Sequence, residues 1–357
     1  MTTPGRRSWI GQVRLRWEYQ RDLATNPAYN KNEGIYTPQP IPTPCGCDEP
    51  HRMDTTDWSG ITQPITITYR RGTEGMGNVL LRGFQLADML TSLGAPVPIK
   101  VQALENLHRA KPRGEILIVL KTAIRMKSEP ILRAFTRQKN TVLFDVVDGL
   151  VPPNLEALPH AYVCSSVTEQ LARDARGALT ILSHQSPDQI VPAVPFDQRP
   201  FRAVYHGDER NAQHLAQLPE ILVLESPMSG SEDRIRAFMD ETLPLLNQTS
   251  HHYSVRKWNE LDGFKPMMKG FFAARLGAVV IASAEDEESR LVLGEDYPYL
   301  AKSSSLEDVK ATIDYARNTH LEEEWHRAVG TMRELRHMSC PVKTAQDLVA
   351  GLRRLPH

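Results

Sequence analysis

The sequence predicts an α/β fold in which parallel strands alternate with helices. Short apolar or β-branched segments, typical of strands, are repeatedly followed by segments whose apolar residues recur at helical spacing. This alternation occurs in two successive sets, and a proline-rich stretch at residues 187–200 separates them. Such alternation is typical of parallel sheets covered by helices on both faces. We therefore expect two Rossmann-like domains that face each other across a cleft, preceded by an N-terminal extension.

The composition is that of an ordinary globular protein. Its 357 residues suffice for about two domains. The 42 basic and 43 acidic residues leave a net charge of −1, so we expect no nucleic-acid partner. No apolar run approaches the length of a membrane span, which is about 18 residues or more, and the arginine-bearing N-terminus lacks the apolar run of a secretory signal. We expect a cytoplasmic protein.

Residues 1–60 differ from the rest of the chain and form the predicted extension. Trp9, Trp17 and Tyr19 lie among arginines, and the proline-rich stretch at 37–44 excludes a helix or a central strand. Two interpretations are open. This arm could contact an anionic membrane surface or a partner, which would make the protein membrane-associated. It could instead pack across the protein's own domains, which is the simpler expectation.

The four cysteines predict neither a disulfide framework nor a metal site. Cys164 and Cys340 are isolated in the sequence, and the cysteine density is far below that of a disulfide scaffold. Cys45 and Cys47, with His51 nearby, could supply half of a metal site. Zinc sites usually place about two to four residues between paired cysteines, and no second pair follows. We therefore expect no bound metal and a reducing compartment.

The first domain is expected at residues 61–200. The loop after its first strand carries Gly72, Gly75 and Gly77, which is not the G-x-G-x-x-G fingerprint of a dinucleotide site. Gly94 is a natural end for the helix that follows this loop. The predicted strands span residues 65–70, 115–121, 141–148, 161–166 and 179–184. The predicted helices span residues 79–94, 129–137 and 167–175.

The second domain is expected at residues 201–330, and a helical, polar segment at 331–357 follows it. Gly277 would end one helix, and Ser305 would cap the start of another. We expect the acidic stretch before the last strand to be a variable loop. The predicted strands span residues 201–207, 221–226, 250–257, 278–284 and 297–300. The predicted helices span residues 233–248, 266–277 and 305–318.

The entrance to the helix at 266–277 carries a group of cations. Lys265 precedes Pro266, a residue favoured in the first helical turn, and Lys269 lies one turn further on the same face. Arg256 lies just upstream and can bind phosphate oxygens with its forked guanidinium. Helix N-termini favour anions through unpaired N–H groups and the helix dipole. We predict that these three cations bind a diphosphate.

The same segment contains the pattern R…KP…K-G-x-x-A-A-x-x-G-A-V-V-I-A-S, followed by an acidic loop and L-G-x-D-Y-P-Y-L. This pattern resembles the C-terminal donor domain of GT-B glycosyltransferases. The resemblance implies a nucleotide-sugar donor held by the second domain, and a leaving diphosphate that is neutralised by basic residues without a metal. It covers the second half of the chain well and the two-domain layout of residues 61–357 loosely.

The sequence departs from this family at one motif. Many retaining members carry E-x7-E near this helix, with the second glutamate on the ribose. The corresponding positions here are Phe264 and Phe272, and neither side chain can accept a hydrogen bond. The resemblance is therefore to a divergent branch with a family 4-like donor domain. The stereochemical outcome, retaining or inverting, stays open.

The resemblance also implies nucleotide contacts from two strand ends. Gly207 follows the first strand of the second domain, where a glycine allows phosphate to approach the backbone. His206 beside it could contact sugar or phosphate, or could be a turn histidine. Ser283 ends the strand at 278–284, and Glu285 begins the acidic run that follows. This run could supply a ribose acceptor or could be a solvated loop.

Glycosyl transfer passes through an oxocarbenium-like state, and an inverting enzyme needs a general base near the acceptor. Asp148, followed by Gly149, is predicted at the carboxyl end of its strand, facing the cleft. It could instead cap a turn. His252, beside Arg256, is the second candidate catalytic residue. His251 is equally ambiguous in sequence.

Together these features predict a metal-independent glycosyltransferase of polysaccharide biosynthesis that takes sugar from a nucleotide-sugar. The acceptor could be a glycan, a lipid-linked molecule or a protein. Two alternatives stay open. A non-catalytic GT-B protein that binds a glycan or a partner would explain the missing glutamates. A two-domain sugar-nucleotide epimerase would share the architecture, but such enzymes usually keep a clearer glutamate pair.

Overall fold

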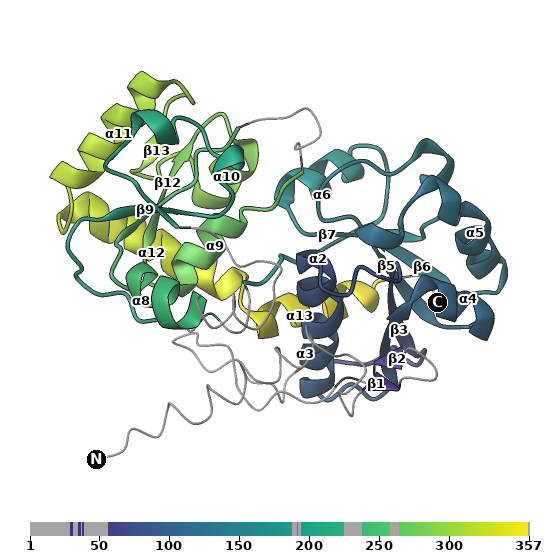
Figure 1. Cartoon of the computed structure of the whole chain (residues 1–357). Helices are drawn as coiled ribbons and strands as arrows, with labels where there is room; N and C mark the ends of the chain where they lie inside the picture. The colour runs from purple at the N-terminus through teal and green to yellow at the C-terminus, as the bar shows by residue number, and fades with distance from the viewer. Residues whose placement is uncertain are drawn as a thin grey trace, which may run out of the picture.

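The computed structural model describes residues 29–30, 35–36, 38, 56–187, 191, 194–224, 238–257 and 264–355. These residues form two lobes, each built on its own sheet with helices packed against it (Figure 1). This arrangement confirms the predicted α/β class. The expectations about Trp9, Trp17, Tyr19 and the segment from Cys45 to His51 concern residues outside the described ranges.

The first sheet contains the strands β1 (Tyr29–Asn30), β2 (Ile35–Tyr36), β3 (Ile65–Tyr69), β4 (Ile99–Ala103), β5 (Ile116–Leu120), β6 (Thr141–Asp145), β7 (Ala161–Cys164) and β8 (Thr180–Leu182). Their order in the sheet is β1-β2-β4-β3-β5-β6-β7-β8. The neighbours from β4 to β8 run parallel, because helices connect them. By contrast, β2 runs antiparallel to both β1 and β4. The expectation of purely parallel strands is therefore wrong at this edge.

Part of the N-terminal extension belongs to this first lobe. Tyr36 in β2 is fully buried, and its hydroxyl donates to Asp88 Oδ1 at 2.8 Å. Its ring lies edge-on to Phe84, with 5.2 Å between the ring centroids. The described residues of the extension thus pack on the protein's own domain, as the simpler interpretation predicts. Contact of the remaining extension with a membrane stays a prediction.

The helices of the first lobe are α2 (Gly77–Val79), η2 (Leu80–Gln85), α3 (Leu86–Ser92), α4 (Leu104–Ala110), α5 (Glu129–Arg137) and α6 (Val167–Asp174), with single turns η3 (Lys121–Ala123), η4 (Met126–Ser128) and η5 (Pro153–Leu155). The predicted helix at 79–94 is confirmed, although η2 in its middle is a π-helical turn. The helix stops as predicted at Gly94, whose φ of 74° suits glycine.

The strand β4 and the helix α4 were not anticipated. The strand sequence IKVQA is short, and it passes directly into the helix without a Gly, Pro or Asn at the boundary. The prolines at 96 and 98, just before this strand, are typical of a loop. Partners in the sheet, β2 on one side and β3 on the other, supply the hydrogen bonds that make this segment a strand.

The second sheet contains β9 (Ala203–His206), β10 (Leu222–Leu224), β11 (His251–Tyr253), β12 (Val279–Ser283) and β13 (Leu300–Ala301). All neighbours run parallel, in the order β10-β9-β11-β12-β13. The helices around it are η6 (Glu209–Asn211), η7 (Leu215–Gln217), η8 (Phe238–Thr242), α8 (Leu243–Leu246), α9 (Met268–Arg275), α10 (Glu287–Leu293), α11 (Leu306–Asn318) and α12 (Glu323–Met338). Ser305 caps α11 as predicted, by accepting the N–H of Asp308 at 3.2 Å.

The acidic stretch is a helix rather than a variable loop. Asp286 caps α10 by accepting the backbone N–H of Ser289 at 3.3 Å. The predicted strand at 297–300 is also misplaced, because β13 begins only at Leu300. Tyr297 and Tyr299 are buried side chains before it, and Tyr297 donates its hydroxyl proton to the carbonyl of Val280 at 2.9 Å.

The C-terminal part of the chain crosses from the second lobe back to the first (Figure 1). After α12, the helix α13 (Pro341–Leu352) packs against α3 and β8. Ser183 Oγ donates to the carbonyl of Thr344 at 2.9 Å, and Gly351 faces Ile181 so closely that a Cβ would collide with it. The helical prediction for this segment is confirmed, but α13 carries a largely buried, apolar face rather than a polar surface.

Candidate active site

The carboxyl edges of the two sheets meet at direct contacts between the lobes. Ser166, just after β7, donates its hydroxyl proton to the carbonyl of Phe264 at 2.9 Å. Glu288 of α10 accepts the backbone N–H groups of Val167 at 3.1 Å and Thr168 at 2.9 Å, and also the Thr168 hydroxyl. A carboxylate from the second lobe thus occupies the N-terminus of α6, where the helix dipole favours it. Strand ends that usually hold ligands therefore lie together here.

Lys269 and Gly207 form the tightest cluster on the second lobe. Lys269 Nζ donates to the carbonyl of His206 at 2.7 Å and lies 4.3 Å from the centroid of the Tyr205 ring. Gly207 has a φ of 143°, and a Cβ there would lie 2.6 Å from Nζ. The φ favours glycine at this position, and a Cβ would displace the Lys269 ammonium. The structure brings these two predicted residues together at the end of β9.

The environment of Lys269 makes its charge sensitive to pH. Burial, and after it the nearby Arg256 guanidinium, lower the pKa of Lys269 to about 8, while Asp208 opposes both. A cation at this point is held in a largely apolar setting next to an open strand end. Such a charge is favoured when an anion is bound beside it.

Arg256 is paired with an acid. Its Nε and Nη2 atoms lie 2.7 and 2.6 Å from Asp286 Oδ2, and the carboxylate is 2% exposed. The same carboxylate accepts the hydroxyl of Ser289 at 2.8 Å. Arg256 therefore links the end of β11 to the start of α10. Its predicted role as a diphosphate ligand stays a prediction, with its charge partly offset by Asp286.

Ser283 and Glu285 form a polar cluster with Ser304 at the ends of β12 and β13. Ser283 Oγ accepts the hydroxyl of Ser304 at 3.0 Å and the backbone N–H of Glu285 at 3.2 Å. Glu285 is exposed, and its Oε2 accepts the N–H of Ser304 at 3.0 Å. His214 Nε2 lies 2.7 Å from the carbonyl of Ser304. The predicted pair is thus adjacent, and one carboxylate oxygen of Glu285 is fixed on a backbone N–H.

Lys265 lies where the segment before α9 touches the first lobe. It is half-buried and directly follows Phe264, whose carbonyl accepts the Ser166 hydroxyl. The helix begins at Met268, two residues later than predicted, so Lys265 precedes it and Lys269 is its second residue. Lys265 thus lies beside the interlobe contact, and Lys269 lies against the end of β9.

No protein-family model matches the sequence, and a search of curated proteins finds no match. Solved structures match in fold. The apo structure of OtsA has a TM-score of 0.50 at 8% identity, covering 83% of this chain and 100% of that one. HepE from Anabaena, in complex with UDP-glucose, has a TM-score of 0.51 at 12% identity, covering 81% and 98%. A glycosyltransferase from Rickettsia africae has a TM-score of 0.53 at 10% identity, covering 82% and 98%.

The chain has the GT-B fold. Two Rossmann-like lobes with facing strand ends, and a last helix that returns to the first lobe, make up this GT-B protein. None of its described helices is long and apolar enough to cross a membrane. Among the described residues, no group of three or more His, Cys, Asp or Glu side chains is arranged to hold a metal ion.

Asp148 lies at the carboxyl edge of the first GT-B domain. The strand β6 ends at Asp145, three residues earlier than predicted, and Asp148 lies in the turn that follows. Val147 before it has a φ of 65°, which is rare for a β-branched residue. Its carbonyl accepts the Ser165 hydroxyl at 2.9 Å, which fixes this turn to the end of β7. Asp148 itself is ion-paired with Lys121 and is 24% exposed.

His252 is a core residue, and the structure does not bring it to the strand ends. It is 3% exposed in β11, and its ring centroid lies 5.9 Å from that of Phe272. Burial lowers the pKa of His252 to about 3, so the ring is neutral. His251 is also buried and neutral, since burial lowers its pKa well below the usual value. The prediction that either histidine points to the cleft is wrong, because both side chains pack inside the sheet's helical cover.

The aromatic residue at the missing glutamate position is part of the same packing. Phe272 stacks on His206, with 5.0 Å between centroids and 24° between planes. His206 therefore supports α9 with its ring and binds Lys269 with its carbonyl. The stacking of Phe272 on His206 is thus a packing contact between α9 and β9.

Sequence reasoning missed several residues at the first lobe's strand ends. Arg82 in η2 forms a buried pair with Asp145 at 2.8 Å and donates to the carbonyls of Ser183 and His184 at 2.9 and 3.1 Å. The His184 ring lies 5.3 Å from that of Phe271 in α9, across the lobe contact. In the sequence, these residues stand out only as polar residues at the ends of strands. Their mutual contacts could not be predicted, because the partners lie far apart in the chain.

Proposed function

We propose that this GT-B protein is a glycosyltransferase that transfers a sugar from a nucleotide-sugar to an acceptor without a metal. The proposal is carried by Lys269, a half-buried cation whose Nζ lies at the end of β9 next to Gly207. The donor diphosphate would lie between this strand end and the start of α9. The likeness in fold to HepE, which was solved in complex with UDP-glucose, supports a nucleotide-sugar as the donor.

The chemistry follows from these cations. Breaking the bond between the anomeric carbon and the diphosphate leaves negative charge on the leaving oxygen, and fixed cations stabilise that charge as it grows. Lys269 and Lys265 would act on the diphosphate, and Arg256 would share its charge with Asp286. Glu285 would accept a ribose hydroxyl. Asp148, opposite on the first domain, would take the proton of the acceptor hydroxyl.

The experiment that tests this proposal measures the thermal midpoint of the protein with a panel of nucleoside diphosphates and nucleotide-sugars. A ligand that binds only the folded state stabilises it and so raises the thermal midpoint. At a ligand concentration a hundredfold above Kd, the added stability is about 2.7 kcal/mol. We expect one base to raise the midpoint more than the others. Equal midpoints with every donor and with buffer would contradict the proposal.

Diphosphate binding is expected to weaken as the pH rises through about 8. The pKa of Lys269 is about 8 in the free protein, so Lys269 is charged below that pH and neutral above it. Above it, binding must take up a proton, and the loss of one charge-assisted contact costs roughly tenfold or more in Kd. Calorimetric titrations with the nucleoside diphosphate, from about pH 7 to about pH 9, measure this. Lys269→Arg stays charged and should flatten the profile.

A non-catalytic binder is the second candidate, because Phe272 fills the ribose glutamate position and packs on His206. A non-catalytic binder is expected to bind the same nucleotides but not to turn over the nucleotide-sugar. Release of free sugar from a labelled nucleotide-sugar, by slow hydrolysis when no acceptor is present, separates the two. Hydrolysis that disappears in Lys269→Met supports the transferase, and tight binding with no turnover supports the binder.

A further inference from the structure

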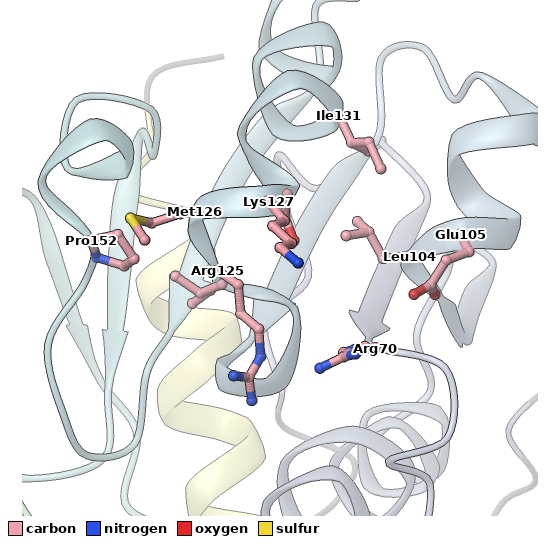
Figure 2. A pocket seen from close by; sticks show the side chains of 10 residues that line it. Arg70, Leu104, Glu105, Arg125, Met126, Lys127, Ile131 and Pro152 are labelled. Atoms are coloured by element: carbon pink, nitrogen blue, oxygen red, sulfur yellow. The ribbon is translucent and has the colours of Figure 1, made fainter.

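The first lobe has a cavity of about 590 Å³ that the proposed donor site does not use (Figure 2). Its walls come from residues that follow three adjacent strands: Arg70 follows β3, Leu104 follows β4, and the segment from Ile124 to Ser128 follows β5. Ile131 of α5 and Pro152 complete it. The cavity therefore lies at the carboxyl edge of the first sheet, where parallel sheets bind ligands.

Positive charge dominates the cavity wall. Arg70, Arg125 and Lys127 line it, against one acid, Glu105. In the described part of the chain, none of these three cations forms an ion pair. Arg125 is oriented by a hydrogen bond from Nε to the carbonyl of Thr122 at 3.2 Å. Glu105 accepts the backbone N–H of Arg71 in the neighbouring loop, and its single negative charge leaves the cavity wall positive. Figure 2 shows Arg70 and Arg125 reaching toward the same side of the cavity.

The cavity shares its loops with the proposed general base. Lys121, which is ion-paired with Asp148, begins the same loop after β5 that carries Arg125 and Lys127. Pro152 lies four residues after Asp148 in the loop that follows β6. The cavity and Asp148 are therefore built on the same two loops, those that follow β5 and β6.

Apolar side chains form the rest of the wall. Leu104, Ile124 and Ile131 form its apolar floor, and Met126, which also lines it, is 69% exposed. Leu150, in the loop that carries Asp148, is 71% exposed. The cavity thus combines forked cations with an apolar floor. This combination suits a ligand with an anionic end and a less polar body.

We propose that this cavity binds a phosphate monoester group on the acceptor of the transfer reaction. Guanidinium groups bind phosphate through paired N–H···O contacts, and Arg70 and Arg125 supply two such groups on one side. The inference rests on the proposed function, because it names the class of acceptor for that site. The phosphate could be borne by a soluble sugar or by a lipid headgroup, and the apolar floor is compatible with either body.

The test is a calorimetric titration of the full chain, saturated with a nucleoside diphosphate, so that the donor site is not available to phosphate. The probes are a hexose 6-phosphate, an alkyl phosphate below its micellar concentration, and the unphosphorylated hexose. We expect the phosphorylated probes to bind and the free hexose not to bind. The variant Arg70→Gln/Arg125→Gln should bind the phosphorylated probes at least about tenfold more weakly, the scale of a lost charge-assisted contact.

The matched control is Arg137→Gln. Arg137 is also exposed, but it ends α5 next to the amino end of β6, at the opposite edge of the sheet. The Arg137→Gln variant should bind the phosphorylated probes as tightly as the wild type does. Tighter binding of the alkyl phosphate identifies a lipid source, and tighter binding of the hexose phosphate identifies a soluble one. Equal binding by wild type and the Arg70→Gln/Arg125→Gln variant, or no binding of either phosphate, overturns the proposal. A nucleoside diphosphate that fails to bind contradicts the proposed function instead, and the variant comparison is then made without it.

Discussion

Replacing Arg82 with methionine is expected to lower the free energy of unfolding by about 3–5 kcal/mol, which is the cost of leaving one partner of a buried ion pair alone. Arg82 is 1% exposed and Asp145 is fully buried. The guanidinium also donates to the carbonyls of Ser183 and His184, so its loss leaves a carboxylate and two carbonyls without their donor. Urea unfolding of the variant and the wild type measures the difference.

The pH dependence of the Arg82→Met variant identifies the cause. Burial already raises the pKa of Asp145, and Arg82 is the group that lowers it again. Without Arg82 the folded variant holds a proton on Asp145 at a higher pH than the unfolded chain does. Its stability should therefore be greatest at low pH and fall as the pH rises through this raised pKa. A deficit that stays constant with pH would instead indicate a packing defect.

Two further variants serve as controls for the Arg82→Met result. Arg82→Met/Asp145→Leu removes both charges and should recover part of the lost stability, since buried pairs are often replaceable by apolar residues. Arg133→Ala removes a surface cation that pairs with Glu129 on α5. It should change the urea midpoint little, because solvent screens exposed pairs.

Replacing Lys269 with methionine is expected to reduce the rate of glycosyl transfer by about a hundredfold or more, the scale of losing one preorganised charge stabiliser. Methionine matches the lysine chain as far as Cε, so α9 and Tyr205 keep most of their packing while the ammonium at the end of β9 is lost. The hydrogen bond to the carbonyl of His206 is lost with it. Initial rates of sugar release or transfer from the donor, with the thermal midpoint as a folding check, measure this.

Gly207→Ala is the matched test of geometry rather than charge. A Cβ at this position would lie 2.6 Å from Lys269 Nζ, so the amine must move although its charge remains. We expect a loss of activity intermediate between wild type and Lys269→Met. If Gly207→Ala and Lys269→Met were both fully active, the diphosphate would have to bind elsewhere.

Local signals in the sequence predicted the elements of the second lobe around α9. The helix ends as predicted near Gly277, whose φ of 65° and contact with the carbonyl of Pro195 exclude a side chain. The apolar run at 278–284 could only be a buried strand. Lys269 and Gly207 were both predicted as ligand contacts. Their mutual contact was not, because 62 positions separate them in the chain.

Other features depend on partners that the sequence does not place. His252 lies in a strand that is buried on both faces, so period-two alternation could not distinguish a cleft-facing side chain from a core one. The acidic run became α10 because Asp286 both caps the helix and binds Arg256, which lies thirty positions away. The cavity beside Asp148 collects loops from three strands, one of which, β4, had no recognisable boundary in the sequence.

The return of α13 to the first lobe has a consequence for the order in which the protein matures on the ribosome. The groove between α3 and β8 is filled by residues from 341 to 352, which are synthesised after the entire second lobe. Buried side chains such as Leu348 then complete a core that began with Ile65, and until they arrive the first sheet keeps an apolar surface uncovered. Among the described residues, the core cluster of the second lobe around β9 to β13 includes no side chain of α13. The lobe that is translated first is therefore the one that is finished last, and it is the one at risk of aggregation in a nascent chain.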